Sequence, residues 1–200
     1  MSLHVRTAGD EDVAQAADVL ARAFATDPPF VAALGHPDEP QRLLRCLYAS
    51  LLRHHYLSRG AVDVAVDGDE VMGVAVWGAP GRGALPLGAK ARIAREVLPV
   101  YGLRAIRLLR QERIIAAHYP PGEYWYLFAI GVGVPGRGVG GLLLDHGVAR
   151  ATEHGCYLEA STPSSARLYE RKGFVRRGDV EVEGGPLVRM WREPAPVNQV

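Results

Sequence analysis

The stretch "AIGVGVPGRGVGGLLL", residues 129–144, holds six glycines within eleven residues, between two apolar runs. Gly131, Gly133 and Gly136 fit the G-x-G-x-x-G spacing of a dinucleotide-binding loop, whereas Gly136, Gly138 and Gly140 fit a different phosphate-binding loop. In both interpretations a strand leads into a glycine turn that opens a helix, so unpaired amides and the helix dipole point at one place. The spacing therefore predicts a site for a diphosphate.

The position of this loop in the chain separates the two interpretations. Glu159 lies 23 positions after Gly136, near the end of the next predicted strand, where an acid would meet the ribose of a dinucleotide. However, roughly 60 residues follow the loop, too few for the further β-α units of a dinucleotide-binding sheet. The second interpretation is therefore favoured, and the order of strands in the sheet distinguishes the two.

Three segments in the second half of the chain resemble the GCN5-related N-acetyltransferase (GNAT) superfamily, in the order and spacing of that family: "PGRGVGGLLL" (135–144), "LEAS" (158–161) and "ARLYERKGF" (166–174). Earlier segments are similar to its first strand and helix and to its hairpin, and the nearest similarity is to small-molecule acetyltransferases. The resemblance implies a mixed, mostly antiparallel α/β (α+β) sheet of about seven strands flanked by helices. It also implies acetyl-CoA as cosubstrate and a small-molecule amine as acceptor.

The resemblance also assigns positions to the cosubstrate. Backbone amides would hold the pyrophosphate, and the backbone edge of the preceding strand would pair with the pantetheine arm. One side chain on a later helix stands where the family often has an asparagine. These positions are Gly136, Arg137, Gly138, Val139, Gly140 and Gly141 for the pyrophosphate, Ile130, Gly131 and Val132 for the arm, and Ser164 for the asparagine. Pro135 departs from the family because it stands where Gln or Arg is usual, and the connection from Val132 to Gly138 is two residues shorter.

Acetyl transfer from a thioester to an amine needs a neutral amine, a polarised carbonyl and a proton for the departing thiolate. The resemblance implies that Tyr169 is the general acid; the alternative is an aromatic ring that only contacts the core. Two carboxylates are candidates for the general base: Glu123 directly before the strand 124–132, and Glu159 in the following strand. Glu159 ranks first because an interior carboxylate has a raised pKa suited to accepting a proton.

The elements that must position these groups follow from periodicity and turn residues. We expect strands at 3–6 and 124–132, around the turn at 67–69, and at 156–161 and 186–192, with helices at 11–25, 40–57, 90–118, from 139 and from 164. Pro28 and Pro29 are expected to stop the first helix, and Pro99 and Gly102 to interrupt the helical segment 90–118. Residues 1–200 then form a single domain, in which a basic helical segment at about 81–121 lies on the acceptor side.

Composition limits the remaining function classes. A net charge of +1 gives no electrostatic case for binding nucleic acid. No run approaches the ~20 apolar residues of a membrane span, and the first residues lack an export signal, so we expect a cytoplasmic protein. A homodimer is left open as its oligomeric state. His54 and His55 are adjacent and have poor metal-ligand geometry, so no metal is expected. A non-catalytic acyl-CoA-binding domain is the alternative function, and an NAD-dependent enzyme is the third.

Overall fold

The computed structural model describes residues 3–82 and 85–194, and the strands within these ranges form one seven-stranded sheet in the order β1-β2-β3-β4-β5-β7-β6. The strands are β1 (His4–Thr7), β2 (Gly60–Asp67), β3 (Glu70–Gly78), β4 (Trp125–Val132), β5 (Cys156–Ala160), β6 (Val175–Val182) and β7 (Gly185–Arg192). In this part of the chain β4 and β5 are the only parallel neighbours. The predicted mixed, mostly antiparallel sheet is confirmed. The dinucleotide interpretation was wrong, because that fold needs a parallel, doubly wound sheet.

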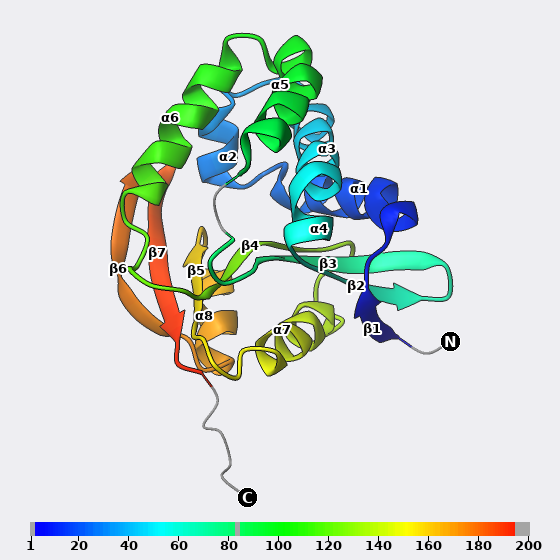
Figure 1. Ribbon diagram of the computed structural model, residues 1–200, viewed down its shortest axis with the longest axis vertical. Coiled ribbons are helices and arrows are strands. Elements are labelled where there is room, and N and C mark those ends of the chain that lie inside the picture. Colours follow the sequence, from blue (N-terminus) through cyan, green and yellow to red (C-terminus); the bar gives the residue numbers. More distant parts are fainter. Residues whose placement is uncertain (1–2, 83–84, 195–200) are drawn as a thin grey trace, which may run out of the picture.

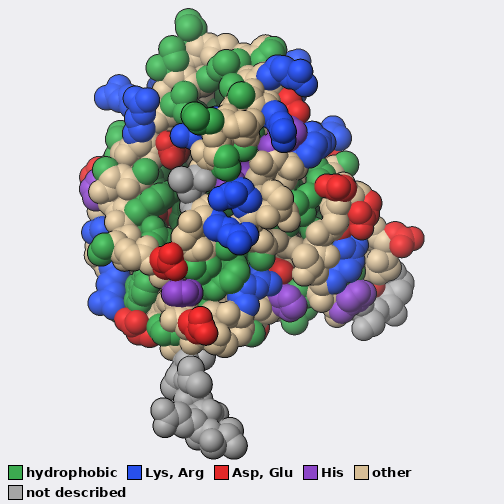
Figure 2. Space-filling view, viewed as in Figure 1, with side chains coloured by type: hydrophobic (Ala, Val, Ile, Leu, Met, Phe, Trp, Pro, Cys, Tyr) green, Lys and Arg blue, Asp and Glu red, His purple; other side chains and the backbone are tan. Residues whose placement is uncertain are grey.

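Helices cover both faces of the sheet (Figure 1). They are α1 (Val13–Phe24), α2 (Pro28–Ala33), α3 (Pro40–Leu51), α4 (Leu57–Arg59), α5 (Leu87–Tyr101), α6 (Arg104–Ala116), α7 (Val139–Ala149) and α8 (Pro163–Arg171), with single turns η1 (Asp10–Asp12) and η2 (Leu52–Tyr56). Figure 1 shows α7 and α8 on one side, and α1, α3 and α4 on the other, with α5 beyond α3 and α6 running from α5 toward the upper ends of β6 and β7. Arginine and lysine side chains alternate with hydrophobic ones over the α5–α6 end (Figure 2).

Two apolar clusters, one on each face, hold the helices to the sheet. Because successive side chains of a strand point to opposite faces, Val74 and Val76 of β3 enter the cluster beneath α1 and α3. Ala75 and Trp77, the residues between and after them, enter the cluster beneath α7 and α8. The central strands are therefore buried on both faces, which explains their nearly continuous apolar sequence.

Of the expected helix interruptions, only the one at Pro99 is not found in the structure. Pro28 and Pro29 follow the end of α1, as predicted, but they also begin α2, since a proline at the first helical positions loses no hydrogen bond. Asp27 caps this short helix by accepting from the Phe30 amide at 3.4 Å. Gly102, with φ of +53°, does separate α5 from α6, whereas Pro99 lies inside α5 without ending it.

A buried ion pair ties α7 to β2. The Asp63 side chain is 0% exposed, and Arg150 donates to its two oxygens at 2.6 and 2.8 Å. The guanidinium also lies 5.6 Å from the centre of the Trp125 ring. The planar fork of arginine thus satisfies a carboxylate that has no contact with water.

The parallel pairing between β4 and β5 is short. These strands pair only at Trp125–Cys156 and Tyr126–Tyr157 within the described residues. The register of β4 against β3 shifts at Phe128, a β-bulge that bends the strand. From residue 127 onward, β4 therefore has a neighbouring strand only on its β3 side.

Among residues 3–82 and 85–194, no helix combines the length and the apolar character needed to cross a membrane. Within the same residues, no three histidine, cysteine or acidic side chains are arranged to hold a metal ion.

Candidate active site

The glycine loop between β4 and α7 forms a cradle of backbone. Gly136 and Gly138 have φ of +85° and +75°, a conformation that other residues rarely adopt. The Leu142 amide, which donates to the Gly138 carbonyl at 3.0 Å, is the first in α7 with a backbone partner among the described residues, so the amides of 139–141 remain unpaired. No described atom lies within 4 Å of a Cβ built on Gly136 or Gly138. The loop is open, and its donors fit an anionic group.

Of the other glycines in this stretch, Gly131 has a packing role, whereas Gly140 and Gly141 have room for a side-chain carbon. A Cβ on Gly131 would lie 2.9 Å from the Cβ of Ala23, so this glycine lets α1 approach β4. A Cβ on Gly140 would meet Leu168 at an ordinary 3.7 Å. Gly141 lies beside Lys172, whose ammonium pairs with Asp145 at 2.6 Å. Gly131 thus completes the G-x-G-x-x-G spacing for a reason unrelated to a dinucleotide.

The open edge of β4 leads to this loop. Ile130, Gly131 and Val132 pair with β3 on one side and have no β5 partner on the other. Pro135 and Arg137 are exposed in the loop itself. A strand-like ligand could add to this edge through backbone hydrogen bonds, with its anionic end at the start of α7.

Tyr169 is fixed at the end of α8 by a Schellman motif. The amide of Gly173, with φ of +84°, donates to the Glu170 carbonyl at 3.0 Å, and the Phe174 amide donates to the Tyr169 carbonyl at 3.1 Å. The Tyr169 ring is buried, 6.0 Å from the centre of the Phe174 ring. Burial raises the pKa of Tyr169, and the charge of Asp27 acts in the same direction. The phenol is therefore protonated at neutral pH and able to donate.

Glu159 lies on β5, in hydrogen-bond contact with β4. The Tyr126 hydroxyl donates to its Oε2 atom at 2.8 Å, while Oε1 is buried with no hydrogen-bond partner among the described residues. Burial raises the pKa of Glu159 to about 7, although the hydroxyls of Tyr157 and Tyr126 oppose the shift. This carboxyl can therefore gain or lose a proton near neutral pH.

Glu123, the other candidate base, lies elsewhere. Its side chain is 60% exposed and 3.9 Å from the His154 Nε2 atom, on the loop before β4. It flanks Gly81 rather than Glu159. Ser164 is exposed in the first turn of α8, where its hydroxyl lies 3.0 Å from that of Thr162. The structure thus places Glu159 at the parting of β4 and β5, and Glu123 outside it.

Sequence reasoning missed a second buried carboxylate, Asp27. It is 8% exposed and accepts a short hydrogen bond from the hydroxyl of Ser161, which directly follows β5. Burial raises the pKa of Asp27, and its charge in turn raises the pKa of Tyr169 and Tyr48. An aspartate directly before two prolines is a signal for a helix cap. That signal predicts the position of Asp27 in α2, but not its proximity to Tyr169.

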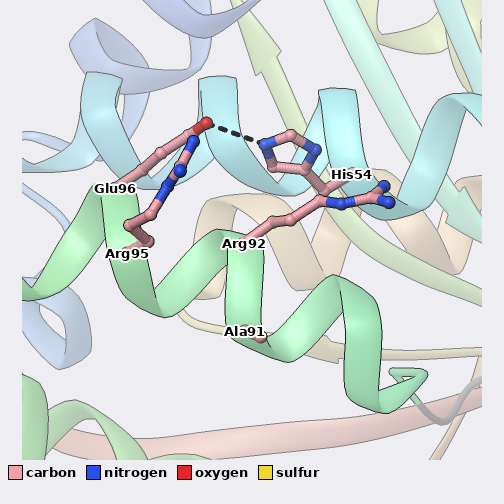
Figure 3. A pocket seen from close by; sticks show the side chains of 5 residues that line it. All are labelled: His54, Ala91, Arg92, Arg95 and Glu96. Atoms are coloured by element: carbon pink, nitrogen blue, oxygen red, sulfur yellow. Dashed lines mark hydrogen bonds and ion pairs between the residues drawn. The ribbon is translucent and has the colours of Figure 1, made fainter.

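Two surface hollows lie away from these groups. One, of about 320 Å³, is formed by His54 of η2 and by Ala91, Arg92, Arg95 and Glu96 of α5. In Figure 3 the His54 ring faces Glu96, with 2.8 Å between Nε2 and Oε1. A second hollow, of about 650 Å³, lies on α6 beside Arg110 and Arg113. Neither includes the glycine loop, Tyr169 or Glu159.

No protein-family model matches the chain. Among solved structures, it is similar to the histone acetyltransferase HPA2 and related acetyltransferase from Corynebacterium glutamicum, with 32% identity, coverage of 99% of both chains and a TM-score of 0.76. Arylalkylamine N-acetyltransferase 2 from Aedes aegypti shares the fold, at 17% identity, 98% and 100% coverage and a TM-score of 0.66. So does an acetyltransferase of the GNAT family from Desulfovibrio desulfuricans, at 17% identity, 97% and 100% coverage and a TM-score of 0.58.

The 32% identity over nearly the whole of both chains agrees with three features of the structure: the sheet order, the parting of β4 from β5 and the glycine loop before α7. The chain belongs to the GCN5-related N-acetyltransferase (GNAT) superfamily and is an acetyltransferase.

Proposed function

We propose that this enzyme transfers the acetyl group of acetyl-CoA to the amine of a small molecule. The observation that carries the proposal is the parting of β4 from β5 after Tyr126. It leaves one open strand edge that runs from the Glu159–Tyr126 hydrogen bond to the unpaired amides of the glycine loop. A long, extended ligand with a diphosphate at one end and a reactive acyl group at the other fits these two ends.

The chain's own residues suit such a cosubstrate. The amides at 136–141 would hold the pyrophosphate, and the backbone of Ile130–Val132 would pair with the pantetheine arm. Pro135 contributes no amide, but the open geometry at Gly136 and Gly138 supports a cradle without it. When bound, acetyl-CoA supplies an acetyl group activated on sulfur.

Two side chains would then move protons. The overall reaction converts an ammonium and a thioester into an amide, a thiol and one released proton. Glu159, in its ionised form, would accept a proton from the ammonium, so that the nitrogen has a free electron pair to form the new bond to the acetyl carbon. Tyr169 would donate a proton to the sulfur as the carbon–sulfur bond breaks, and the second proton leaving the nitrogen would restore the phenol.

Asp27 is a second candidate for the proton acceptor, because it is buried and its charge acts on Tyr169. Its carboxylate, however, already accepts from the Ser161 hydroxyl and the Phe30 amide. Glu159 has one oxygen with no partner among the described residues, which leaves that atom available for a substrate. We therefore assign proton acceptance to Glu159 and a positioning role to Asp27.

The test measures coenzyme A release from acetyl-CoA across a panel of primary amines. Tyr169→Phe should lower kcat roughly 100-fold or more, the range of a lost general acid, with unchanged affinity for acetyl-CoA. Tyr101→Phe is the matched control, because that hydroxyl bonds to the Leu43 carbonyl, away from the site. Full activity of Tyr169→Phe would contradict the acid role. Tight binding of acetyl-CoA without turnover of any amine would favour a non-catalytic binding domain instead.

A further inference from the structure

We propose that Glu159 and a cluster of four tyrosines form the binding site for the acceptor, and that the acceptor is a primary monoamine with an aromatic body. The tyrosine cluster consists of Tyr119, Tyr124, Tyr126 and Tyr157. The assignment as an acceptor site rests on the proposed function, but the binding of an aromatic ammonium can be tested without catalysis.

The rings of the tyrosine cluster come from three separate segments. Tyr126 of β4 and Tyr157 of β5 are stacked, with 5.9 Å between ring centres. Tyr119, in the loop after α6, lies 5.2 Å from Tyr126 and 5.9 Å from Tyr157, and Tyr124 lies 5.5 Å from Tyr157. Tyr157 is buried, whereas the other three are half-buried, so the cluster reaches from the surface to Glu159. Aromatic faces attract cations and pack well against other rings.

Glu159 has no ion pair among the described residues, although a cation faces it. Arg189 of β7 is its direct partner in the strand register. The Arg189 guanidinium instead donates to the carbonyls of His118 and Arg177, both at 3.3 Å. A buried carboxylate normally has a counter-ion or is protonated. Arg189 therefore acts on Glu159 through its charge without donating to the carboxylate, so a ligand cation can take the place of a bonded partner.

The hydrogen bonds of the site are also incomplete. Glu159 Oε1 and the Tyr157 hydroxyl lie near enough to shift each other's pKa, yet both are buried without a hydrogen bond of ordinary geometry among the described residues. Such groups are uncommon in folded proteins, and a ligand that donates hydrogen bonds satisfies them. A primary ammonium carries three donors, which suits two acceptors close together, and one carboxylate balances one positive charge.

The other charges around the cluster leave its interior suited to a single cation. Glu112 of α6 is exposed, and its negative charge raises the pKa of Tyr119 and Tyr56. Arg189 contributes positive charge beside Glu159. A second ammonium on the same ligand would find no second carboxylate to pair with, because Glu159 is the only carboxylate hydrogen-bonded to the cluster in the described part of the chain. An aromatic body avoids that cost.

The experiment is calorimetric titration of the full chain at pH 8, alone and with coenzyme A. The probes are phenethylamine, its neutral analogue phenethyl alcohol, and the dication agmatine. Phenethylamine should bind more tightly than the other two. Glu159→Gln should weaken its binding about tenfold or more, in line with loss of a charged hydrogen bond. Tyr157→Phe, which removes only a hydroxyl, should weaken it less, and Glu153→Gln, on an exposed loop, should have no effect.

Equal binding of the alcohol, unchanged affinity in Glu159→Gln with a native circular dichroism spectrum, or tighter binding of agmatine would each overturn the proposal. The transferase proposal and the acceptor-site proposal can be refuted independently of each other. If phenethylamine binds through Glu159 but no coenzyme A is released from acetyl-CoA, the transferase proposal fails and the site stands. If amines are acetylated and Glu159→Gln leaves their KM unchanged, the site fails and the transferase proposal stands.

Discussion

Replacing Glu159 with glutamine should change how the free energy of unfolding depends on pH. Burial raises the pKa of Glu159 from its ordinary 4.5 to about 7. Between these values the folded chain retains a proton that the unfolded chain has released, so the free energy of unfolding falls as the pH rises. Each unit of pKa difference corresponds to about 1.36 kcal/mol, which gives a fall of up to ~3 kcal/mol across the window. Below pH 4.5 and above pH 7 this contribution is constant.

Glu159→Gln has no proton to release at this position, so it should gain stability relative to the wild type as the pH rises. Urea unfolding at pH 4.5, 6, 7 and 8, followed by tryptophan fluorescence, measures the difference. Glu153 is exposed, so for Glu153→Gln the curve of unfolding free energy against pH should run parallel to that of the wild type. If the Glu159→Gln curve is parallel as well, the carboxyl is not desolvated, and both its role as a base near neutral pH and the unmet need for a counter-ion are refuted.

Three further substitutions test individual parts of the structure. Gly138→Ala, at φ of +75°, should cost about 1–2 kcal/mol and weaken coenzyme A binding in a titration, whereas Gly88→Ala, with open space around it, should leave that affinity unchanged. Arg150→Leu should lower the free energy of urea unfolding by about 3–5 kcal/mol because it removes both hydrogen bonds of Arg150 to the buried Asp63 and leaves the His146 ring, 3.6 Å away, as a poor replacement; failure of Asp63→Leu to restore stability in the double variant would argue against this cause. Gly173→Ala, at φ of +84°, should cost about 1–2 kcal/mol and also lower kcat; a loss of stability alone would separate the helix end from catalysis.

The glycine loop and the α8 end could be predicted because their signals are local. A helix that ends at a glycine followed by an apolar residue is the sequence form of the Schellman motif, and Gly173 and Phe174 adopt it. The open geometry at Gly136 and Gly138 likewise follows from residue type. Gly131 was misleading, because its spacing matched a ligand loop while its role is to admit Ala23 of α1, a contact between distant segments.

The surroundings of the two glutamates could not be predicted, because they depend on pairing between distant strands. Glu123 directly precedes a predicted strand and Glu159 lies within one, yet the first is exposed beside His154 and the second is half-buried, with its Oε1 atom enclosed and its Oε2 atom bonded to Tyr126. The difference arises from the loop after α6, which brings Tyr119 over β4 and β5. No periodicity within either strand carries that information.

The short pairing between β4 and β5 divides the sheet into two hydrogen-bonded plates, β1–β4 and β5–β7, joined by a seam of two residue pairs. Tyr126 belongs to the first plate, which leads into the glycine loop. Glu159 and Arg189 belong to the second plate. The Tyr126–Glu159 hydrogen bond therefore acts as a latch across the seam. Rotating one plate against the other would break few backbone hydrogen bonds, because two residue pairs join them among the described residues.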